Sequence, residues 1–448
     1  MDNKLRRVGV GVSLRLCSKA NNQFDKLPKE IVYDIMSRLP VESISHCRFV
    51  SKDWYNLVKD CFFVNFQHNS SSSRLGSHGD GLLVVCHTTK EDEQELYLLV
   101  EEENVVPFPT INSSSLLNKM KPLNINLDDF SSKFIKVIAS SNGLMCLVLS
   151  PWNYMFYICN PVTREVLKLP EPPGLDSCFN TNKLEYMYPT SSGFAFHAPT
   201  MEYKVVRTWY FKAIDTGLIY TGIEIYTIGS GELWRRIDKQ DIISTSTLRR
   251  LPTSQVFLNG ALHWELEDLT KPQFKHSIGV VHIGDEKFTS LEIPPVDVGV
   301  KFRTLISLRQ CLCLTDDFKD HMILWIMKSY GVARSWTRLY FIRKARLGPL
   351  QTLPFIGVKT LKNGSILLSG GGYHGYYDFD KHEFKQIFID SPPERLDIVV
   401  HIASLISPAT IAGKGEEYRA QSTPRRPIRF TLKRKAKKLL TASCIFGN

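Results

Sequence analysis

The chain has 448 residues, of which 43% are hydrophobic and 23% charged, and its formal net charge is +11. These values are typical of a globular protein with one large and one small domain. Residues 1–22 have a net charge of +4 and residues 414–448 one of +8, and subtracting both from +11 leaves −1. The excess positive charge therefore belongs to two tails, and not to a nucleic-acid-binding face of the folded body.

The ten cysteines contain no C-x-x-C pair, and several lie inside apolar, strand-like runs. They are interpreted as buried free thiols, which favours a reducing compartment over a secreted location. No apolar run approaches the roughly 20 residues that a membrane-spanning helix needs. Residues 1–22 are expected to be a basic flexible leader, with a weak organelle-targeting presequence as the alternative.

Residues 24–66 carry the clearest helical pattern. Pro28 suits the first turn of a helix, and Pro40 ends that helix. A second short helix is expected over residues 41–47, and Ser51 is a suitable N-cap for a third. The apolar stripe expected on the first helix consists of Ile31, Val32, Ile35, Met36 and Leu39.

Three short helices make a small core, so apolar surface is left over. Either another protein covers it, or the chain's own larger domain does. The order LP-x-EI-xx-DI-x-SRLPV-x-S, followed by V-SK-xW, closely resembles the F-box, the helical module that docks onto the Skp-family adaptor of cullin-RING ubiquitin ligases. The resemblance implies that adaptor contact is made or supported by Leu27, Pro28, Ile31, Ile35, Leu39, Pro40, Val41, Val50, Ser51 and Trp54.

After a Ser/Gly-rich linker at 69–81, the pattern changes to short β-branched and aromatic runs that continue to about residue 406. Asn-Gly pairs, which favour tight hairpins, occur at Asn142, Asn259 and Asn363. Hairpin units recur about every 50 residues, which indicates a β-propeller. Six blades are expected, with seven as the alternative, and strand 398–406 should pair beside the first blade and close the ring. Two packed β-sandwiches are the alternative fold.

A second resemblance covers about residues 140–390. The phrases GLMCLVLSPWNYMFYICNPVTREVLKLP, NGALHW and YGVARSW look like the F-box-associated domain, a divergent kelch-like propeller of plant F-box proteins. The fold class expected is therefore α+β by segment, with a three-helix F-box before an all-β propeller. The expected parts are a leader (1–22), an F-box (23–68), a linker (69–81), a propeller (82–411) and a basic disordered tail (412–448).

Candidates for chemistry are weak in this sequence. Cys311 and Cys313 project to one face of a strand, but no further ligand follows at metal-binding spacing, so a buried pair is favoured. His263 and His282 lie in strands and are interpreted as hydrogen-bonded core histidines. No nucleophile turn or phosphate-binding loop is present. We therefore expect no catalytic residues, no metal and no cofactor.

The resulting hypothesis is the substrate-recognition subunit of an SCF-type ubiquitin ligase, with a Skp-type adaptor, a cullin and an unknown client protein as partners. No membrane partner is expected, and nucleic acid is disfavoured. The alternative is a nuclear regulatory or scaffold protein whose basic tail contacts nucleic acid, and a weaker alternative is a propeller enzyme. The protein is expected in the nucleus, the cytoplasm or both. A nuclear-import cluster, or else a solvated tail, is predicted at Lys433, Arg434, Lys435, Lys437 and Lys438.

Overall fold

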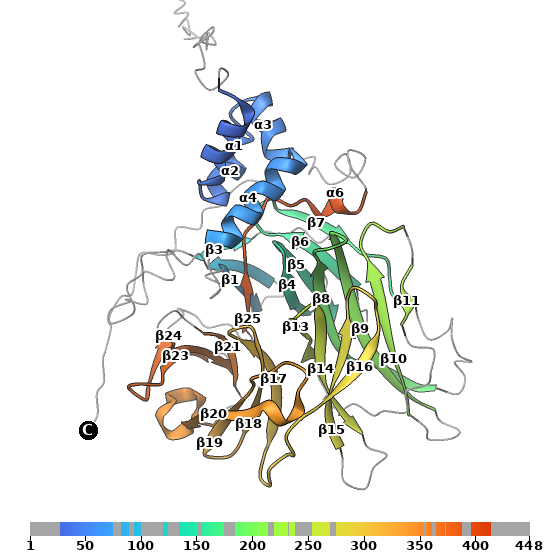
Figure 1. Ribbon diagram of the computed structural model, residues 1–448, viewed down its shortest axis with the longest axis vertical. Helices are drawn as coiled ribbons and strands as arrows, with labels where there is room; N and C mark the ends of the chain where they lie inside the picture. The colour runs from blue at the N-terminus through green and yellow to red at the C-terminus, as the bar shows by residue number, and fades with distance from the viewer. Residues whose placement is uncertain are drawn as a thin grey trace, which may run out of the picture.

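The fold is given by a computed structural model (Figure 1), in which helices at one end of the molecule rest on a set of β-sheets. The structure describes residues 27–74, 82–88, 94–99, 120–123, 134–150, 155–173, 184–213, 219–231, 233–237, 253–268, 275–352, 355–360, 364–371, 373–387 and 396–413. The predicted leader, most of the predicted linker and all of the predicted basic tail except residues 412 and 413 lie outside these residues.

The described N-terminal segment forms α1 (Lys29–Ser37), α2 (Val41–Cys47), α3 (Lys52–Lys59) and α4 (Cys61–Arg74). The first three follow the sequence prediction closely, because their boundaries are set by local signals. Pro28 and Pro40 are the N-cap residues of α1 and α2. The Ser51 hydroxyl accepts a hydrogen bond from the Trp54 amide at 3.3 Å and so caps α3.

Helix α4 corrects the predicted domain boundary, because it continues six residues into the segment that was expected to be a flexible linker. The helix begins where the Asp60 carboxylate accepts a hydrogen bond from the Phe63 amide at 3.0 Å. Phe63, Gln67 and His68 are buried along one side of the helix. This tertiary packing stabilises a serine-rich end that has little helical preference of its own.

The described strands form six sheets, which we number in chain order. Sheet 1 is β25 (Leu396–His401), β1 (Leu82–Thr88), β2 (Gln94–Leu99) and β3 (Met120–Leu123); sheet 2 is β4 (Phe134–Ser141), β5 (Leu144–Ser150), β6 (Met155–Asn160) and β7 (Glu165–Lys168); sheet 3 is β11 (Arg235–Arg236), β10 (Ile219–Thr227), β9 (Glu202–Ala213), β8 (Leu184–His197) and β12 (Thr253–Ser254).

The remaining sheets are assembled from consecutive strands of the second half of the chain. Sheet 4 is β13 (Val256–Leu258), β14 (Ala261–Asp268), β15 (Lys275–His282) and β16 (Phe288–Glu292); sheet 5 is β17 (Phe302–Leu308), β18 (Cys311–Asp317), β19 (His321–Met327) and β20 (Trp336–Arg343); sheet 6 is β21 (Ile356–Thr360), β22 (Ile366–Gly370), β23 (Tyr373–Asp378) and β24 (Glu383–Ile387). The short helices are η4 (Ala333–Ser335), η5 (Lys344–Arg346), η6 (Gly348–Gln351) and α6 (Pro408–Ile411).

The sheets are arranged as a β-propeller that the last strand closes. The inner strands contact one another in the cycle β4, β8, β13, β17, β21, β25 and back to β4. Strand β25 pairs antiparallel with β1, with Ile398 opposite Val85. The prediction that a late strand pairs beside the first unit is confirmed, and the alternative of two packed sandwiches is wrong. This pairing covers the inner edge of β1 and joins the first and last described strands of the ring in one sheet.

Two of the three Asn-Gly turns adopt the backbone geometry that the sequence predicts, and Asn363 of the third lies outside the described residues. Asn142 and Gly143 have φ values of 45° and 81°, and Asn259 and Gly260 have values of 49° and 72°. Positive φ at both central residues gives a turn whose twist matches that of the flanking strands. A side chain at Gly143 would also place its Cβ 2.1 Å from the Ser404 hydroxyl, so this position admits only glycine.

Buried polar contacts join sheet 3 to the connection that precedes it. Arg207 Nε donates to the Glu224 carboxylate at 2.5 Å, and Arg207 Nη2 donates to the Pro173 carbonyl at 2.9 Å. The Trp234 indole N–H donates to the Pro170 carbonyl at 2.9 Å. A proline-rich connection has carbonyls without a strand partner, and these side chains satisfy them.

Sheet 5 is joined to its preceding connection by the same kinds of donor. Arg303 Nη2 donates to the buried Asp316 carboxylate at 2.7 Å, and Nη1 donates to the Pro294 carbonyl at 2.8 Å. The Trp336 indole N–H donates to the Glu292 carbonyl at 3.1 Å. Two distant parts of the ring therefore use an arginine–carboxylate pair and a tryptophan to fix the path of a Pro-Pro segment.

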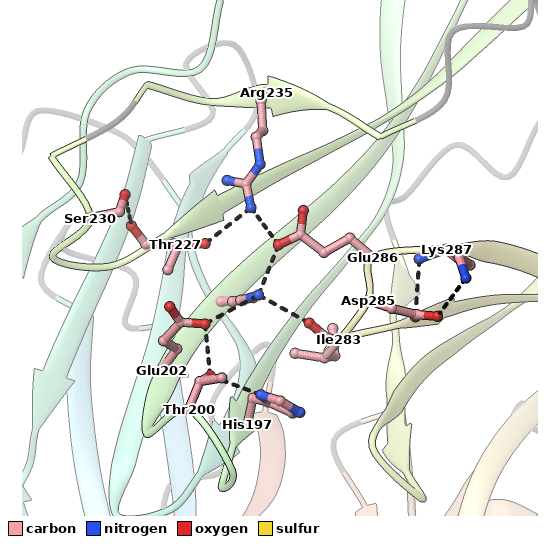
Figure 2. A network of polar contacts seen from close by, with 11 residues as sticks. His197, Thr200, Glu202, Thr227, Ser230, Arg235, Ile283, Asp285, Glu286 and Lys287 are labelled. Atoms are coloured by element: carbon pink, nitrogen blue, oxygen red, sulfur yellow. Dashed lines mark hydrogen bonds and ion pairs between the residues drawn. The ribbon is translucent and has the colours of Figure 1, made fainter.

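A third network connects sheet 3 to sheet 4 (Figure 2). The buried Lys204 ammonium donates to the Ile283 carbonyl at 3.1 Å and to Glu286 at 2.8 Å, and it lies 3.3 Å from Glu202. Arg235 also donates to Glu286. Two cations share the Glu286 carboxylate, and the charge of Lys204 is thereby compensated in a site with little access to water.

Removing one partner of a buried ion pair leaves an uncompensated charge. We therefore predict that Glu224→Gln lowers the free energy of unfolding by about 3–5 kcal/mol, measured by urea denaturation. Asp34→Asn, which breaks the exposed Arg38–Asp34 pair (2.6 Å), is the matched control. Its effect should be below about 1 kcal/mol. Equal effects of the two substitutions would contradict this account of the sheet 3 connection.

The helices are fixed to the ring through α4. His68 Nε2 lies 2.6 Å from Asn142 Oδ1, in the turn between β4 and β5. Asn142 Nδ2 donates to the Tyr203 hydroxyl at 2.8 Å, and that hydroxyl donates to the Asn142 carbonyl at 2.8 Å. Leu405 and Val162 of the propeller domain pack into the helical core. The contact is both polar and apolar, so it sets the position of the helices on the ring.

The segment after β25 completes this junction. The Ser404 hydroxyl donates to the Gly143 carbonyl at 2.9 Å, and Asn160 Nδ2 donates to the carbonyls of Ser404 and Ile406 at 2.9 and 2.8 Å. His401 is fully buried, with its Nδ1 2.7 Å from the Ser140 hydroxyl. Burial, with a smaller contribution from the nearby His68, lowers the pKa of His401 to about 3.

This pKa makes stability depend on pH. The unfolded chain binds a proton at His401 below about pH 6.5, whereas the folded chain does so only near pH 3. The stabilisation is therefore complete above pH 6.5 and is lost as the pH falls, by about 1.4 kcal/mol per pH unit. We predict that His401→Gln reduces the decline in unfolding free energy between pH 6.5 and 5.5 by about 1 kcal/mol, which is less than the full slope because half of the unfolded chains already carry the proton at pH 6.5. His46→Gln, at an exposed ring, is the control, and an unchanged slope in His401→Gln would contradict the prediction.

Candidate adaptor-docking surface

The helical domain has an inner apolar face that forms its own core. In α1 the side chains of Val32 and Met36 point inward, and Met36 is 2% exposed. They meet side chains from the other helices and from the propeller domain. The buried members of this core are Val32, Met36, Val41, Ile44, Val58, Phe63 and Leu405.

The same first helix carries a second apolar face that the described residues leave exposed. Leu27, Ile31, Ile35 and Leu39 recur at four-residue spacing and therefore line one side of α1 and its flanks. Their exposed fractions are 38, 47, 38 and 40%. A continuous row of half-exposed aliphatic side chains is unusual for a surface that faces only water.

A second exposed cluster follows α2. Phe49 is 74% exposed and Val50 is 69% exposed, and Tyr55 on α3 is 39% exposed. The Arg48 guanidinium lies 4.7 Å from the centre of the Phe49 ring. We call the row on α1 and this cluster together the helical docking surface; it consists of Leu27, Ile31, Ile35, Leu39, Phe49, Val50 and Tyr55.

The ten residues that the F-box resemblance implies fall into three groups. Val41 is buried in the helical core, and Trp54 is half-buried against it, so both support the helix packing. Ser51 is exposed and caps α3. The remaining members are exposed and available to a partner: Leu27, Pro28, Ile31, Ile35, Leu39, Pro40 and Val50. Their contact with an adaptor stays a prediction.

Sequence reasoning missed several exposed aromatic residues. Phe49 adjoins Val50 just after α2. The sequence signal that could have indicated an exposed apolar cluster was this pair of apolar residues beyond the end of a helix. Phe62 is 67% exposed and stacks on Phe66, with ring centres 6.4 Å apart, and it also faces Tyr33 at 5.9 Å. Periodicity identifies apolar faces, but it does not say which of two faces is covered.

Few charges interrupt the helical docking surface. Arg38 and Asp34 form an exposed pair one turn apart, which leaves this part of α1 locally neutral. Burial raises the pKa of the Cys47 thiol, so this cysteine stays protonated and donates to the Ser43 carbonyl at 3.4 Å. The surface is suited to burial against another apolar protein surface, and less to binding an ion.

In the described residues, the cysteines and histidines that were considered as candidates for chemistry are parts of the strands and their packing. Cys311 is half-buried and Cys313 buried, and burial raises the pKa of Cys313 to about 12. His263 has its Nδ1 3.0 Å from the Val256 carbonyl and its Nε2 2.7 Å from the Tyr330 hydroxyl, so it is a hydrogen-bonded core residue as predicted. His282, by contrast, is half-buried at the end of β15.

Two other kinds of site are absent from the part of the chain that the structure describes. There, no three His, Cys, Asp or Glu side chains are grouped so that they could hold a metal ion. Within the same residues, no helix has the length and apolar character needed to cross a membrane.

Comparison with known families matches both parts of the chain. Residues 24–65 match the model of the F-box domain, and residues 95–404 match that of the F-box associated beta propeller domain. The chain belongs to the F-box-associated β-propeller family. Both resemblances seen in the sequence are thereby confirmed. F-box proteins are generally non-catalytic substrate adaptors of ubiquitin ligase complexes, and an F-box generally binds a Skp1-type adaptor.

Several F-box proteins of a plant resemble this chain. F-box protein At3g07870 of Arabidopsis thaliana is 29% identical, in an alignment that covers 89% of this chain and 93% of the relative. F-box protein CPR1 of the same plant is 26% identical, with 71% and 74% covered. F-box protein At5g49610 is 26% identical, with 54% and 59% covered. The first alignment includes both domains, so the order of F-box and propeller is shared.

Proposed function

We propose that this chain is the substrate-recognition subunit of an SCF-type cullin-RING ubiquitin ligase. It docks on a Skp-type adaptor, and through it on a cullin, by the helical docking surface, and it holds a client protein on the propeller. The observation that carries this proposal is the uncovered apolar row on α1, where Ile31 is 47% exposed although the opposite side of the same helix is fully packed.

The orientation of the helices supports this proposal. Had the apolar row been packed on the chain's own ring, no partner would be needed to cover it. Instead the ring packs against the inner side, through Leu405 and Val162, and leaves the row outside. Burying such side chains at a partner's surface is favourable by about 25 cal/mol per Å² of apolar area. An adaptor with a complementary apolar groove would gain most from these residues.

We propose that the chain itself carries no catalytic residues and needs no cofactor. A receptor subunit accelerates transfer by holding a client lysine near the ubiquitin-loaded enzyme, which raises its effective concentration. For this the two binding sites must keep a fixed separation. The contacts of α4 with the β4–β5 turn and of Leu405 with the helical core would provide it.

We also infer that the six sheets are the six blades of one ring. The support is that five sheets begin with their own inner strand, whereas sheet 1 receives its inner strand from β25. Among the described strands, the inner strands contact one another in a closed cycle of six, and no further inner strand is left for a seventh blade.

The adaptor assignment predicts the effect of two truncations. Ile31→Ala combined with Ile35→Ala removes apolar atoms that are exposed in the free protein, so the fold should be unaffected. The affinity for a purified Skp-type adaptor, measured by isothermal titration calorimetry, should fall at least about tenfold, since each truncation costs about 1–2 kcal/mol of binding free energy. Leu233→Ala, at a 77% exposed apolar residue of the propeller, is the matched control. Unchanged adaptor affinity in the double variant would refute the assignment.

We propose further that the basic tail directs the protein to the nucleus. The support is compositional, because Lys433, Arg434, Lys435, Lys437 and Lys438 match a nuclear-import cluster. These residues lie outside the described part of the chain. Replacing all five with alanine should shift a fluorescent fusion from the nucleus to the cytoplasm and leave adaptor affinity unchanged. An unaltered distribution would mean that the tail is only a solvated extension.

A further inference from the structure

The outer edge of sheet 5 differs from the other outer edges. Its last strand, β20, has eight residues, whereas β3, β7, β11, β16 and β24 have between two and five. In the described residues no strand pairs with the outward side of β20. A long outer strand presents a row of backbone N–H and C=O groups that can pair with another chain. Figure 1 shows β19 and β20 at the end of the molecule away from the helices.

Apolar side chains at this edge are exposed to solvent. Phe341 is 53% exposed, and Leu339 is 38% exposed. Beside them, residues of β20, the β18–β19 turn and the segment before β17 line a pocket. Phe318, His321 and Phe341 form its aromatic side, with ring centres 4.3 and 4.6 Å apart along the stack. The pocket can take an apolar side chain of a strand laid along β20.

The same edge is strongly basic. Residues 328–346 contain six Lys or Arg and no Asp or Glu, although the body of the chain is close to neutral. Lys344 is buried and pairs with Asp317 at 2.7 Å. Arg338 pairs with Asp297 at 2.8 Å. The other four are exposed and form no ion pair within the described residues: Lys328, Arg334, Arg343 and Arg346.

We propose that the outer edge of sheet 5 is the docking surface for an extended, acidic segment of a client protein. The segment adds a strand to β20, its Asp or Glu side chains meet Arg334 and Arg343, and an apolar side chain enters the pocket beside Phe341. Strand addition gives affinity through main-chain hydrogen bonds, and the pocket and the charges give specificity. The inference deepens the proposed receptor function and rests on it for the partner being a client.

Other occupants fit the edge less well. A second copy of this chain would bring the basic residues of two β20 strands together, and like charges in opposed strands are destabilising. A nucleic acid would match the positive charge, but it would leave the strand amides unpaired. An acidic peptide satisfies the amides, the charge and the apolar pocket together.

The test uses the full-length protein and a displayed library of random 12-residue peptides. Peptides selected on the wild type should be enriched in Asp and Glu with apolar residues between them. Their affinity, measured by fluorescence polarisation, should fall at least about tenfold for R334E/R343E. K381E/K385E makes the same charge change at exposed residues of sheet 6 and should leave affinity unchanged. N-methylation of alternate peptide residues should abolish binding, because it removes the donors of one strand edge.

Several results would overturn the inference. They are a library that yields no binder, selected peptides without acidic enrichment, or equal affinities for R334E/R343E and the control. Binding of a 12-nucleotide oligo-deoxythymidine that is lost in R334E/R343E would assign the edge to nucleic acid instead. The adaptor titration with the same variants separates this result from the function itself. If the protein binds the adaptor but no peptide, only the proposed client surface is refuted. If it binds peptides but not the adaptor, only the proposed receptor function is refuted.

Discussion

The pairing of β25 with β1 is the interaction on which the rest of the structure depends. It joins the two ends of the propeller domain in one sheet, and the residues that follow it then reach the helices. His401 is buried beside Ser140, Ser404 bonds to the Gly143 carbonyl, and Leu405 enters the helical core. A single segment of about a dozen residues therefore closes the ring and also fixes the helical domain to it.

This arrangement explains why the helical domain has two apolar faces. A bundle of this size cannot bury all of its aliphatic side chains by itself. The ring covers one side through Leu405 and Val162, so residues of the chain itself complete the helical core. The other side is thus left available for an interaction that can form and dissociate while the fold persists. Stability and assembly are assigned to opposite faces of α1.

The sequence predicts much of the fold because many of its boundaries are local. Pro28, Pro40 and Ser51 start or end helices by their own backbone and capping chemistry. Asn142 with Gly143 selects a hairpin turn without help from distant residues. The end of α4 could not be predicted in this way, because the serine-rich turns are held by the contact of His68 with Asn142, 74 residues away.

The helical docking surface could be predicted only in part, because burial also depends on contacts between residues that are distant in the sequence. The spacing of Ile31 and Ile35 marks an apolar face, but Val41, which the same family pattern includes, is buried. The basic edge at β20 was not predicted, because the net charge of the whole folded body is close to zero and does not reveal a local group of positive side chains. Its position on an outer strand depends on pairing within sheet 5, and strand order is a tertiary property.

Closure by β25 also has a consequence for biosynthesis. The ribosome makes the helical domain first and the closing strand after every other described strand. Until that strand emerges, the nascent helices lack Leu405 and the first sheet lacks its inner neighbour. The nascent polypeptide therefore cannot complete its cooperative folding before the last strand is made. If translation stopped before residue 396, the released product would lack both Leu405 in the helical core and β25 beside β1. Such products would be substrates for the quality-control machinery of the cell.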